Sequence, residues 1–315
     1  MRYEDIQPLG LRIQENISRV LVGGKEAAEL LLTAVLAGGH ALMEDVPGTG
    51  KTTLAKAFAR SVSGRFERIQ FTPDLLPSDV TGTRVWQQDE GRFAFMQGPV
   101  FCNILLADEI NRATPRTQSA MLECMAEEQV TEGGQSHPLP TPFLVIATQN
   151  PVETQGTFPL PEAQLDRFML QFSLGYPSRA DTVELLQRFS RSEPLEAVEP
   201  VADVRQLSEA RSLCRTCETA PDILDYMAAF AEAARNPERV RLGPSPRAVL
   251  YWLRACQAWA ALHGRPYIIP DDVKRLAVPV LAHRLLMRGL GQQITPAAFL
   301  RELMDTVPVP TETRE

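Results

Sequence analysis

One short segment of the chain has the residues of a phosphate-binding loop. Residues 45–52 read DVPGTGKT and lie between an apolar run and a helix-like pattern. Gly48 and Gly50 would let backbone amides turn toward phosphate oxygens, and the first turn of the following helix would add N–H donors and the positive end of its dipole. Lys51 would reach the β and γ phosphates, and Thr52 would hold Mg²⁺ through its hydroxyl. The segment therefore predicts a site for ATP and Mg²⁺.

The loop departs from the usual pattern at its first residue. The pattern GxxxxGK[ST] has a glycine where this chain has Asp45, so the first turn of the loop must differ. A chance match is the alternative, and the strand and helix expected on either side argue against it.

Two adjacent acids follow another apolar run. In NILLADE, 103–109, Asp108 could orient the magnesium shell and Glu109 could accept a proton from an attacking water. Adjacent acids at the end of a strand are also common on protein surfaces. Together with the phosphate loop, the pair favours nucleotide hydrolysis.

Two further polar side chains stand at the ends of predicted elements. Asn150 belongs to the polar cluster that ends FLVIATQNP, 143–151, and its amide could orient a water or touch the γ phosphate without carrying charge; an ordinary turn before Pro151 is the alternative. Arg167 lies within LPEAQLDRFML, 160–170. It could pair with Asp166 on the surface, which contributes about 0 to 1 kcal/mol, or act as an arginine finger in the site of a neighbouring subunit.

A parallel α/β sheet would position these side chains. In the first half of the chain, apolar runs bounded by turns alternate with helix-like patterns, as in βαβ units. Helices at Lys51–Ser63 and Arg116–Glu127 would help to cover two faces of the sheet, and ligands would bind at the carboxyl ends of the strands. The expected strands are His40–Glu44, Phe66–Phe71, Asn103–Asp108, Phe143–Thr148 and Met169–Ser173.

Two segments interrupt this alternation. Residues 84–96 and 130–142 each have turn residues between extended arms, which predicts a hairpin, although surface loops are the alternative.

After Tyr176 the strand signal vanishes and the pattern is helical. Leu174–Arg179 is the best candidate for a hinge because glycine and proline interrupt it. Helices are expected over 178–191, 203–215, 221–235, 246–263, 271–287 and 295–305.

Composition places limits on the function. The 315 residues suggest about two domains at roughly 150 residues each, and a net charge of −7 gives no general attraction to nucleic acid. The longest apolar stretch, Leu30–Met43, is too short to span a membrane, and no secretory signal is evident, so we expect a cytoplasmic protein without a transmembrane segment. Cys214 and Cys217 form half of a zinc motif whose other half is missing, which favours structural thiols.

The order of these motifs resembles the MoxR family of AAA+ ATPases over nearly the whole chain. This resemblance implies an αβα P-loop AAA+ core with a parallel sheet over residues 1–174, followed by an all-α lid domain over 175–315. The segments that carry it are EDVPGTGKT (44–52), QFTPDLLPSDVTG (70–82), GPVF (98–101), LLADEINRA (105–113), TQNP (148–151), LPEAQLDRF (160–168) and SPRA (245–248).

The resemblance also implies roles for single residues. Asp108 and Thr52 would bind the metal, Glu109 would act on water, Asn150 would be the first nucleotide sensor and Arg167 the finger. Arg247 would be the second sensor, acting in its own subunit or in the next. The nucleotide-binding residues would be Val22 and Gly23 at the adenine, and Pro47, Gly48, Thr49, Gly50, Lys51, Thr52 and Thr53 in the loop.

As a task, the resemblance implies chaperone-like remodelling or maturation of partner protein complexes. It implies a homo-oligomer, a hexameric ring, whose client could be a protein with a von Willebrand A domain. Related ATPases direct comparable hairpins toward the ring pore, so Trp86 and Phe93 would contact substrate or simply anchor the hairpin. Arg112 could act between subunits or in packing. A nucleotide-gated binding module, against which Glu109 argues, and a small-molecule P-loop kinase are the alternatives.

Overall fold

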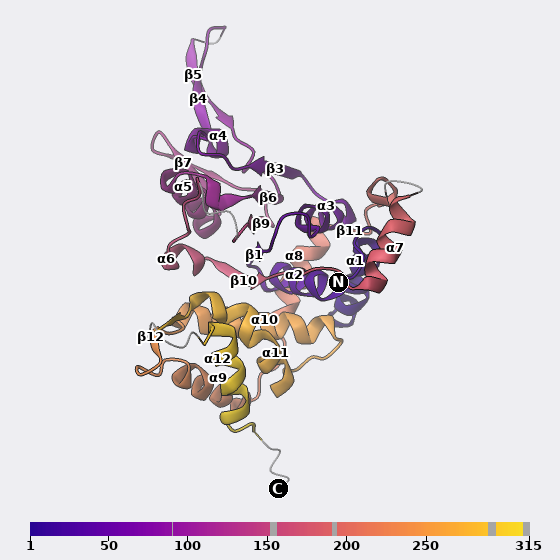
Figure 1. Cartoon of the computed structure of the whole chain (residues 1–315). Coiled ribbons are helices and arrows are strands. Elements are labelled where there is room, and N and C mark those ends of the chain that lie inside the picture. The colour runs from indigo at the N-terminus through magenta and orange to yellow at the C-terminus, as the bar shows by residue number, and fades with distance from the viewer. Residues whose placement is uncertain (90, 152–155, 191–193, 289–293, 311–315) are drawn as a thin grey trace.

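A five-stranded parallel sheet forms the centre of the computed structural model, which describes residues 1–89, 91–151, 156–190, 194–288 and 294–310 (Figure 1). Each strand is paired in parallel with its neighbours. All five predicted strands are confirmed to within one residue at each end. In sheet order the strands are β10 (Phe168–Phe172), β1 (His40–Glu44), β9 (Leu144–Gln149), β6 (Ile104–Asp108) and β3 (Phe66–Gln70).

The strand order decides which loops meet. Strand β9 lies between β1 and β6, so the loop after β1, the acids at the end of β6 and the polar residues after β9 all lie at the carboxyl edge of the sheet. Ligands of open parallel sheets bind at this edge.

Helices cover both faces of the sheet, because successive side chains of a strand point to opposite sides. Met43 and Ile146 belong to one apolar core, and Leu42 and Val145 belong to the other. The predicted αβα architecture is confirmed. Side chains of α1 (Ile6–Val20), α2 (Lys25–Ala37), α3 (Lys51–Ser61), α8 (Val204–Cys214), α10 (Pro246–Leu262) and α11 (Pro270–Leu281) fill the first core, and those of α4 (Pro77–Thr81) and α5 (Pro115–Glu127) fill the second.

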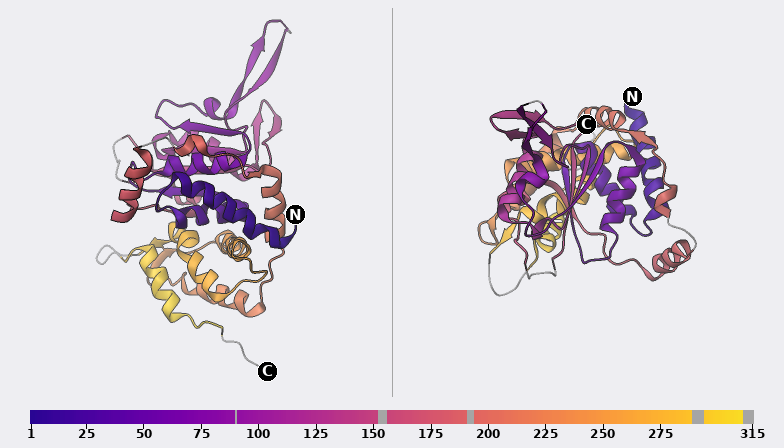
Figure 2. Two further views of the ribbon diagram at one scale, coloured as in Figure 1. Left: turned by 90° about the vertical axis from the view of Figure 1, so that its right-hand side faces the viewer. Right: turned by 90° about the horizontal axis from the view of Figure 1, so that it is seen from above.

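The two predicted hairpins are present. Strands β4 (Gly82–Gln87) and β5 (Arg92–Gln97) form one, and β7 (Gln129–Glu132) and β8 (Gln135–Pro138) form the other. The β4–β5 hairpin projects away from the body of the molecule (Figure 2). Residue 90, in the predicted turn, lies outside the described residues.

Helices dominate the second half, as predicted. The first helix, α7 (Arg179–Phe189), lies within the predicted range, whose last residue, 191, is outside the described residues. Helix α8 packs on α2 of the core. The remaining helices are α9 (Pro221–Ala233), α10, α11 and α12 (Pro296–Thr306). The division between residues 174 and 175 stays a prediction, and no helix within the described residues is both long and apolar enough to cross a membrane.

Three short strands differ from the prediction of an all-helical second half. Strand β11 (Ala202–Asp203) pairs with β2 (Val62–Ser63), which follows α3 where helix was expected. The helix expected over 271–287 ends at Leu281, and β13 (Leu286–Met287) pairs instead with β12 (Val240–Leu242). These pairings join distant segments, which local periodicity does not show.

Candidate functional site

The phosphate loop lies between β1 and α3 and needs its glycines. Gly48 and Gly50 have φ of 83° and 99°, a region that L side chains rarely adopt. A Cβ on Gly50 would also lie 2.9 Å from Cδ1 of Leu21. The N-cap of α3 is Gly50, which has no side chain to cap the helix, so the first N–H groups of α3 could bind an anion.

Asp45, where the usual pattern has glycine, joins the loop to the segment after β10. Its carboxylate accepts the backbone N–H of Val46 at 2.8 Å, of Leu174 at 2.9 Å and of Gly175 at 2.7 Å. The first turn of the loop is therefore held by a side chain. The predicted hinge begins at the two residues that this carboxylate holds.

Lys51 extends its ammonium group to the ends of two strands. Its Nζ donates to the carbonyls of Asp45, of Val46 at 3.3 Å and of Gln149 at 3.2 Å. Burial lowers the pKa of Lys51, and nearby acids, Asp108 among them, oppose this shift. The ammonium group lies between β1 and β9, where a phosphate could replace the carbonyls as its partner.

Asp108 meets Thr52 at the end of β6. Its Oδ2 accepts from Oγ1 of Thr52 at 3.3 Å and from Nη2 of Arg68 at 2.8 Å. Its Oδ1 accepts from Oγ1 of Thr148 at 2.6 Å. A hydroxyl and a carboxylate side by side are hard oxygen ligands, so these two predicted metal ligands fit Mg²⁺.

Glu109 follows in a strained backbone conformation. Its φ of 56° is in the left-handed region, and its N–H donates to Oγ1 of Thr148 at 2.8 Å. Its Oε2 accepts from Nε2 of Gln70 at 2.8 Å and from Nη1 of Arg112 at 3.2 Å. Such strain is often found at functional sites, where the surrounding bonds maintain it.

Asn150 is buried directly after β9, next to this acidic pair. Its carbonyl accepts from Nδ2 of Asn111 at 3.4 Å. Asn111 is itself buried on the turn after Glu109, and its Oδ1 has no partner among the described residues. The turn that begins at Glu109 thus supports the segment that carries Asn150.

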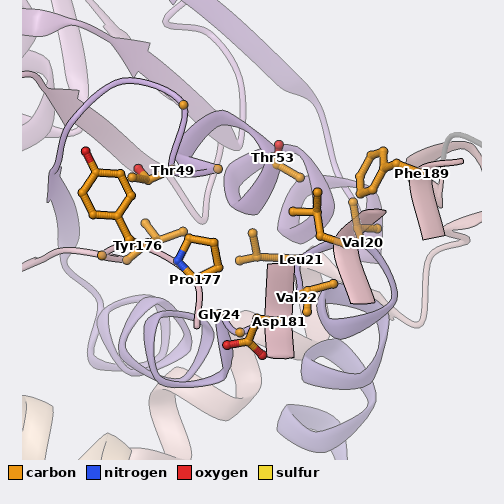
Figure 3. Close-up of a pocket in the computed structure, with 16 residues that line it drawn as sticks. Val20, Leu21, Val22, Gly24, Thr49, Thr53, Tyr176, Pro177, Asp181 and Phe189 are labelled. Atoms are coloured by element: carbon orange, nitrogen blue, oxygen red, sulfur yellow. The ribbon is translucent and has the colours of Figure 1, made fainter. Parts of the chain in front are cut away.

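A pocket of about 300 Å³ opens beside the phosphate loop (Figure 3). In Figure 3, Phe189 and Val20 lie at one end and Tyr176 at the other. Six predicted residues line the pocket: Val22, Gly23, Gly48, Thr49, Gly50 and Thr53. The structure adds Val20, Leu21, Gly24, Leu174, Gly175, Tyr176, Pro177, Asp181, Leu185 and Phe189 to the lining, whereas the predicted Pro47, Lys51, Thr52 and Arg247 are outside it.

Two predicted arginines stand on segments that meet at Asp166, and neither lines this pocket. Nη1 of Arg167 donates to the carbonyl of Leu122 at 2.9 Å, and its backbone N–H donates to the carbonyl of Gln164 at 3.1 Å. Arg247 is exposed in the first turn of α10. The N-cap of α10, Ser245, lies 3.4 Å from both carboxylate oxygens of Asp166, next to Arg167.

Sequence reasoning missed the side chains that hold the acids. Thr148 stands in TQNP and Gln70 begins QFTPDLLPSDVTG, so both lay within segments that carried the resemblance. Arg68 had no such signal. The pocket residues of α7 were missed because their helical pattern gives no sign of facing the loop.

The CxxC pair is buried in the helical part of the chain. Burial raises the pKa of Cys214 to about 12 and also raises that of Cys217. Both thiols are free, and a thiol with a raised pKa is a poor nucleophile. This agrees with the interpretation of structural thiols.

Comparison with known proteins gives a consistent result. Residues 40–170 match the family described as "ATPase family associated with various cellular activities (AAA)", and 232–303 match an AAA lid domain. The uncharacterized protein YeaC of Bacillus subtilis is 44% identical over 98% of this chain and 97% of its own. Chaperone MoxR1 of Mycobacterium tuberculosis is 40% identical over 93% of this chain and 80% of its own. A crystal structure from Cytophaga hutchinsonii superposes with a TM-score of 0.90 at 35% identity, covering 98% of this chain and 97% of that one.

Proposed function

Because this chain belongs to the MoxR family of AAA+ ATPases, we propose that it hydrolyses ATP to ADP and phosphate by attack of water on the γ phosphate. The observation that carries this proposal is the hydrogen bond between Thr52 and Asp108, which joins the phosphate loop to the acidic pair. The phosphate loop alone would fit many nucleotide-binding proteins. An acid at the next position, Glu109, is what hydrolysis requires in addition.

The site would hold ATP and Mg²⁺ with separate groups. The backbone amides of Gly48 and Gly50 and the ammonium of Lys51 would bind the phosphates, while Val22 and Gly23 would contact the adenine. Thr52 and Asp108 would hold Mg²⁺, which when bound offsets the charge on the phosphates. Arg68 must share Asp108 with that ion, because it bonds the same carboxylate oxygen as Thr52.

Glu109 would accept the proton of the attacking water. Among the described residues, Gln70 and Arg112 donate to one carboxylate oxygen, Oε2, and the other oxygen would take the water. The buried Asn150 would orient that water. Thr148 bonds both the carboxylate of Asp108 and the N–H of Glu109, so it would keep the metal ligand and the base in a fixed relation.

We expect the site to be completed by a second copy of the chain. Arg247 is exposed on a segment that meets the turn of Arg167 at Asp166, and the resemblance assigns both arginines to the nucleotide, so we expect them to act on the nucleotide of a neighbouring subunit. A head-to-tail contact of this kind closes into a ring when the rotation allows it. The resemblance suggests six subunits.

The β4–β5 hairpin is our candidate for contact with a protein client. Trp86 and Phe93 are about half exposed, and their rings meet edge to face with centroids 5.0 Å apart. Phe95 anchors the hairpin instead, because its ring contacts Phe101 and stacks on His137. This arrangement favours substrate contact over anchoring for the first two aromatics.

The task proposed is chaperone-like remodelling or maturation of a partner complex in the cytoplasm, and a client with a von Willebrand A domain is the first to test. The name of the relative Chaperone MoxR1 supports the general idea. Glu109→Gln protein with bound ATP should capture such a client. Adding Trp86→Ala to this variant should weaken the capture and leave ATP binding unchanged. Equal capture of the client with and without Trp86→Ala would contradict the role of the hairpin.

The test of hydrolysis is Glu109→Gln. We expect the variant to bind ATP like the parent and to lose turnover by about 10² to 10⁴-fold, the usual contribution of a general base. Glu127→Gln, an exposed acid on α5, is the matched control and should keep parental turnover. Equal turnover in Glu109→Gln and parent would refute the mechanism and favour a nucleotide-gated binding module.

A further inference from the structure

An arginine of the helical lid holds the turn that carries Arg167. Arg284 lies in the short 3-10 turn after α11, with its side chain 2% exposed. Its Nε donates to Oδ1 of Asp166 at 2.8 Å. Its Nη2 reaches the carbonyls of Asp166 at 3.2 Å and of Phe168 at 2.5 Å. One guanidinium therefore bonds the residues on both sides of Arg167.

The remaining contacts of Arg284 keep it in place. Its Nη1 donates to the carbonyl of Met169 at 3.3 Å and lies 2.7 Å from Nε2 of His283. Burial and the charge of Arg284 hold the pKa of His283 well below its ordinary value, and the same Nε2 also lies 3.1 Å from the carbonyl of Phe168. The guanidinium carbon also lies 5.5 Å from the ring centroid of Tyr251 on α10.

Asp166 connects the same turn to Arg247. Both of its carboxylate oxygens lie 3.4 Å from Oγ of Ser245. That hydroxyl in turn accepts the N–H of Ala248 at 3.1 Å and caps α10, in whose first turn Arg247 stands. Arg284 and Ser245 thus bind the two arginine-bearing segments to a single carboxylate.

Stability alone does not account for this cluster. A buried ion pair costs several kcal/mol of desolvation per ion, and apolar residues of similar volume often serve stability as well. What a planar guanidinium adds is several N–H groups in a fixed geometry. At this turn, that geometry fixes the direction in which Arg167 leaves the backbone.

We propose that Arg284 and Asp166 are positioning residues, which hold Arg167 and Arg247 as one rigid pair directed at the nucleotide of the neighbouring subunit. This inference rests on the proposed function of Arg167. It has a specific consequence: loss of Arg284 should damage the arginines that a subunit donates and leave that subunit's own nucleotide pocket intact.

The test uses Arg284→Lys, which keeps the charge but cannot span the same acceptors. We expect kcat to fall by about 10²-fold, the effect of a displacement near 1 Å, with the KM for ATP nearly unchanged. Mixing Arg284→Lys protein with Lys51→Ala protein should restore part of the activity. In mixed assemblies, Lys51→Ala subunits supply correctly positioned Arg167 and Arg247 to the unaltered nucleotide pockets of Arg284→Lys subunits. Arg301→Lys, an exposed arginine on α12, is the control and should behave like the parent.

Parallel variants separate the possible failures. Asp166→Asn should also lose activity and regain part of it on mixing with Lys51→Ala protein. This variant allows the same test if Arg284→Lys does not fold. If Arg167→Ala is rescued by Lys51→Ala while Arg284→Lys and Asp166→Asn are not, the positioning role is overturned and the proposed finger stands. A raised KM for ATP or a parental kcat in Arg284→Lys would overturn it too. If Lys51→Ala protein does not rescue Arg167→Ala, the proposed action of Arg167 on the neighbouring subunit is itself contradicted.

Discussion

Replacing Asp45 tests whether this unusual residue joins the phosphate loop to the hinge. Asp45→Ala would remove the acceptor of the Leu174 and Gly175 N–H groups, which lie 2.9 and 2.7 Å from its Oδ2. An unpaired donor costs about 1 to 3 kcal/mol when buried, and these groups are only partly buried, so we expect a loss of about 2 to 4 kcal/mol. For a chain of 315 residues this corresponds to a fall in Tm of about 3 to 6 °C.

The same change should weaken ATP binding, because Leu174 and Gly175 line the pocket beside the phosphate loop, where we propose that ATP binds. If about 1.4 kcal/mol of this lost free energy reduces the free energy of ATP binding, the Kd for ATP rises about tenfold. Scanning calorimetry and titration calorimetry would measure the two effects. Asp305→Asn, an exposed acid on α12, is the control.

Asp45→Gly gives the sharper comparison, since it restores the glycine of the usual loop pattern. We expect it to be as defective as Asp45→Ala, because the hinge loses its acceptor in both. A glycine variant with parental Tm and ATP affinity would refute the reasoning.

Two further predictions concern pH and magnesium. His40 is buried with Nδ1 accepting from Val145, and burial lowers its pKa to about 4. As the pH falls, His40 takes up a proton near pH 6.5 in the unfolded chain but only near pH 4 in the folded chain, so the unfolding free energy should fall by about 3 kcal/mol between these pH values. Urea titrations at several pH values should show a flatter pH dependence in His40→Gln than in the parent. Equal pH dependence in the two proteins would contradict this. Arg68→Ala should lower the magnesium concentration needed for half-maximal turnover by up to about fivefold, because Arg68 is 42% exposed and its ion pair with the buried Asp108 is then worth about 0 to 1 kcal/mol. An unchanged or higher magnesium requirement would show that Arg68 does not compete with the metal.

The strands and the phosphate loop could be predicted because their signals are local. The apolar run His40–Glu44, the glycines of the loop and the acids after β6 each stand within one short segment. The sequence order of the strands does not contain their order in the sheet, so the place of β9 between β1 and β6, which brings Thr148 to Asp108, had to come from the structure.

Contacts between distant segments account for the differences. The expected helix over 271–287 ends early because β13 pairs with β12 and Arg284 binds the turn after α6 (Glu162–Leu165). The contribution of α7 to the pocket and the grouping of Arg167 with Arg247 depend in the same way on tertiary packing, which no local pattern specifies.

The dependence of turnover on assembly tests the central claim most directly. ATPase activity per chain should be measured from high to low protein concentration, with the mass of the species determined at every point. We expect activity per chain to collapse as the assembly dissociates, because in the proposed site Arg167 and Arg247 act on the nucleotide of the next subunit. A verified monomer that hydrolyses ATP at the full rate of the assembled protein would contradict the account.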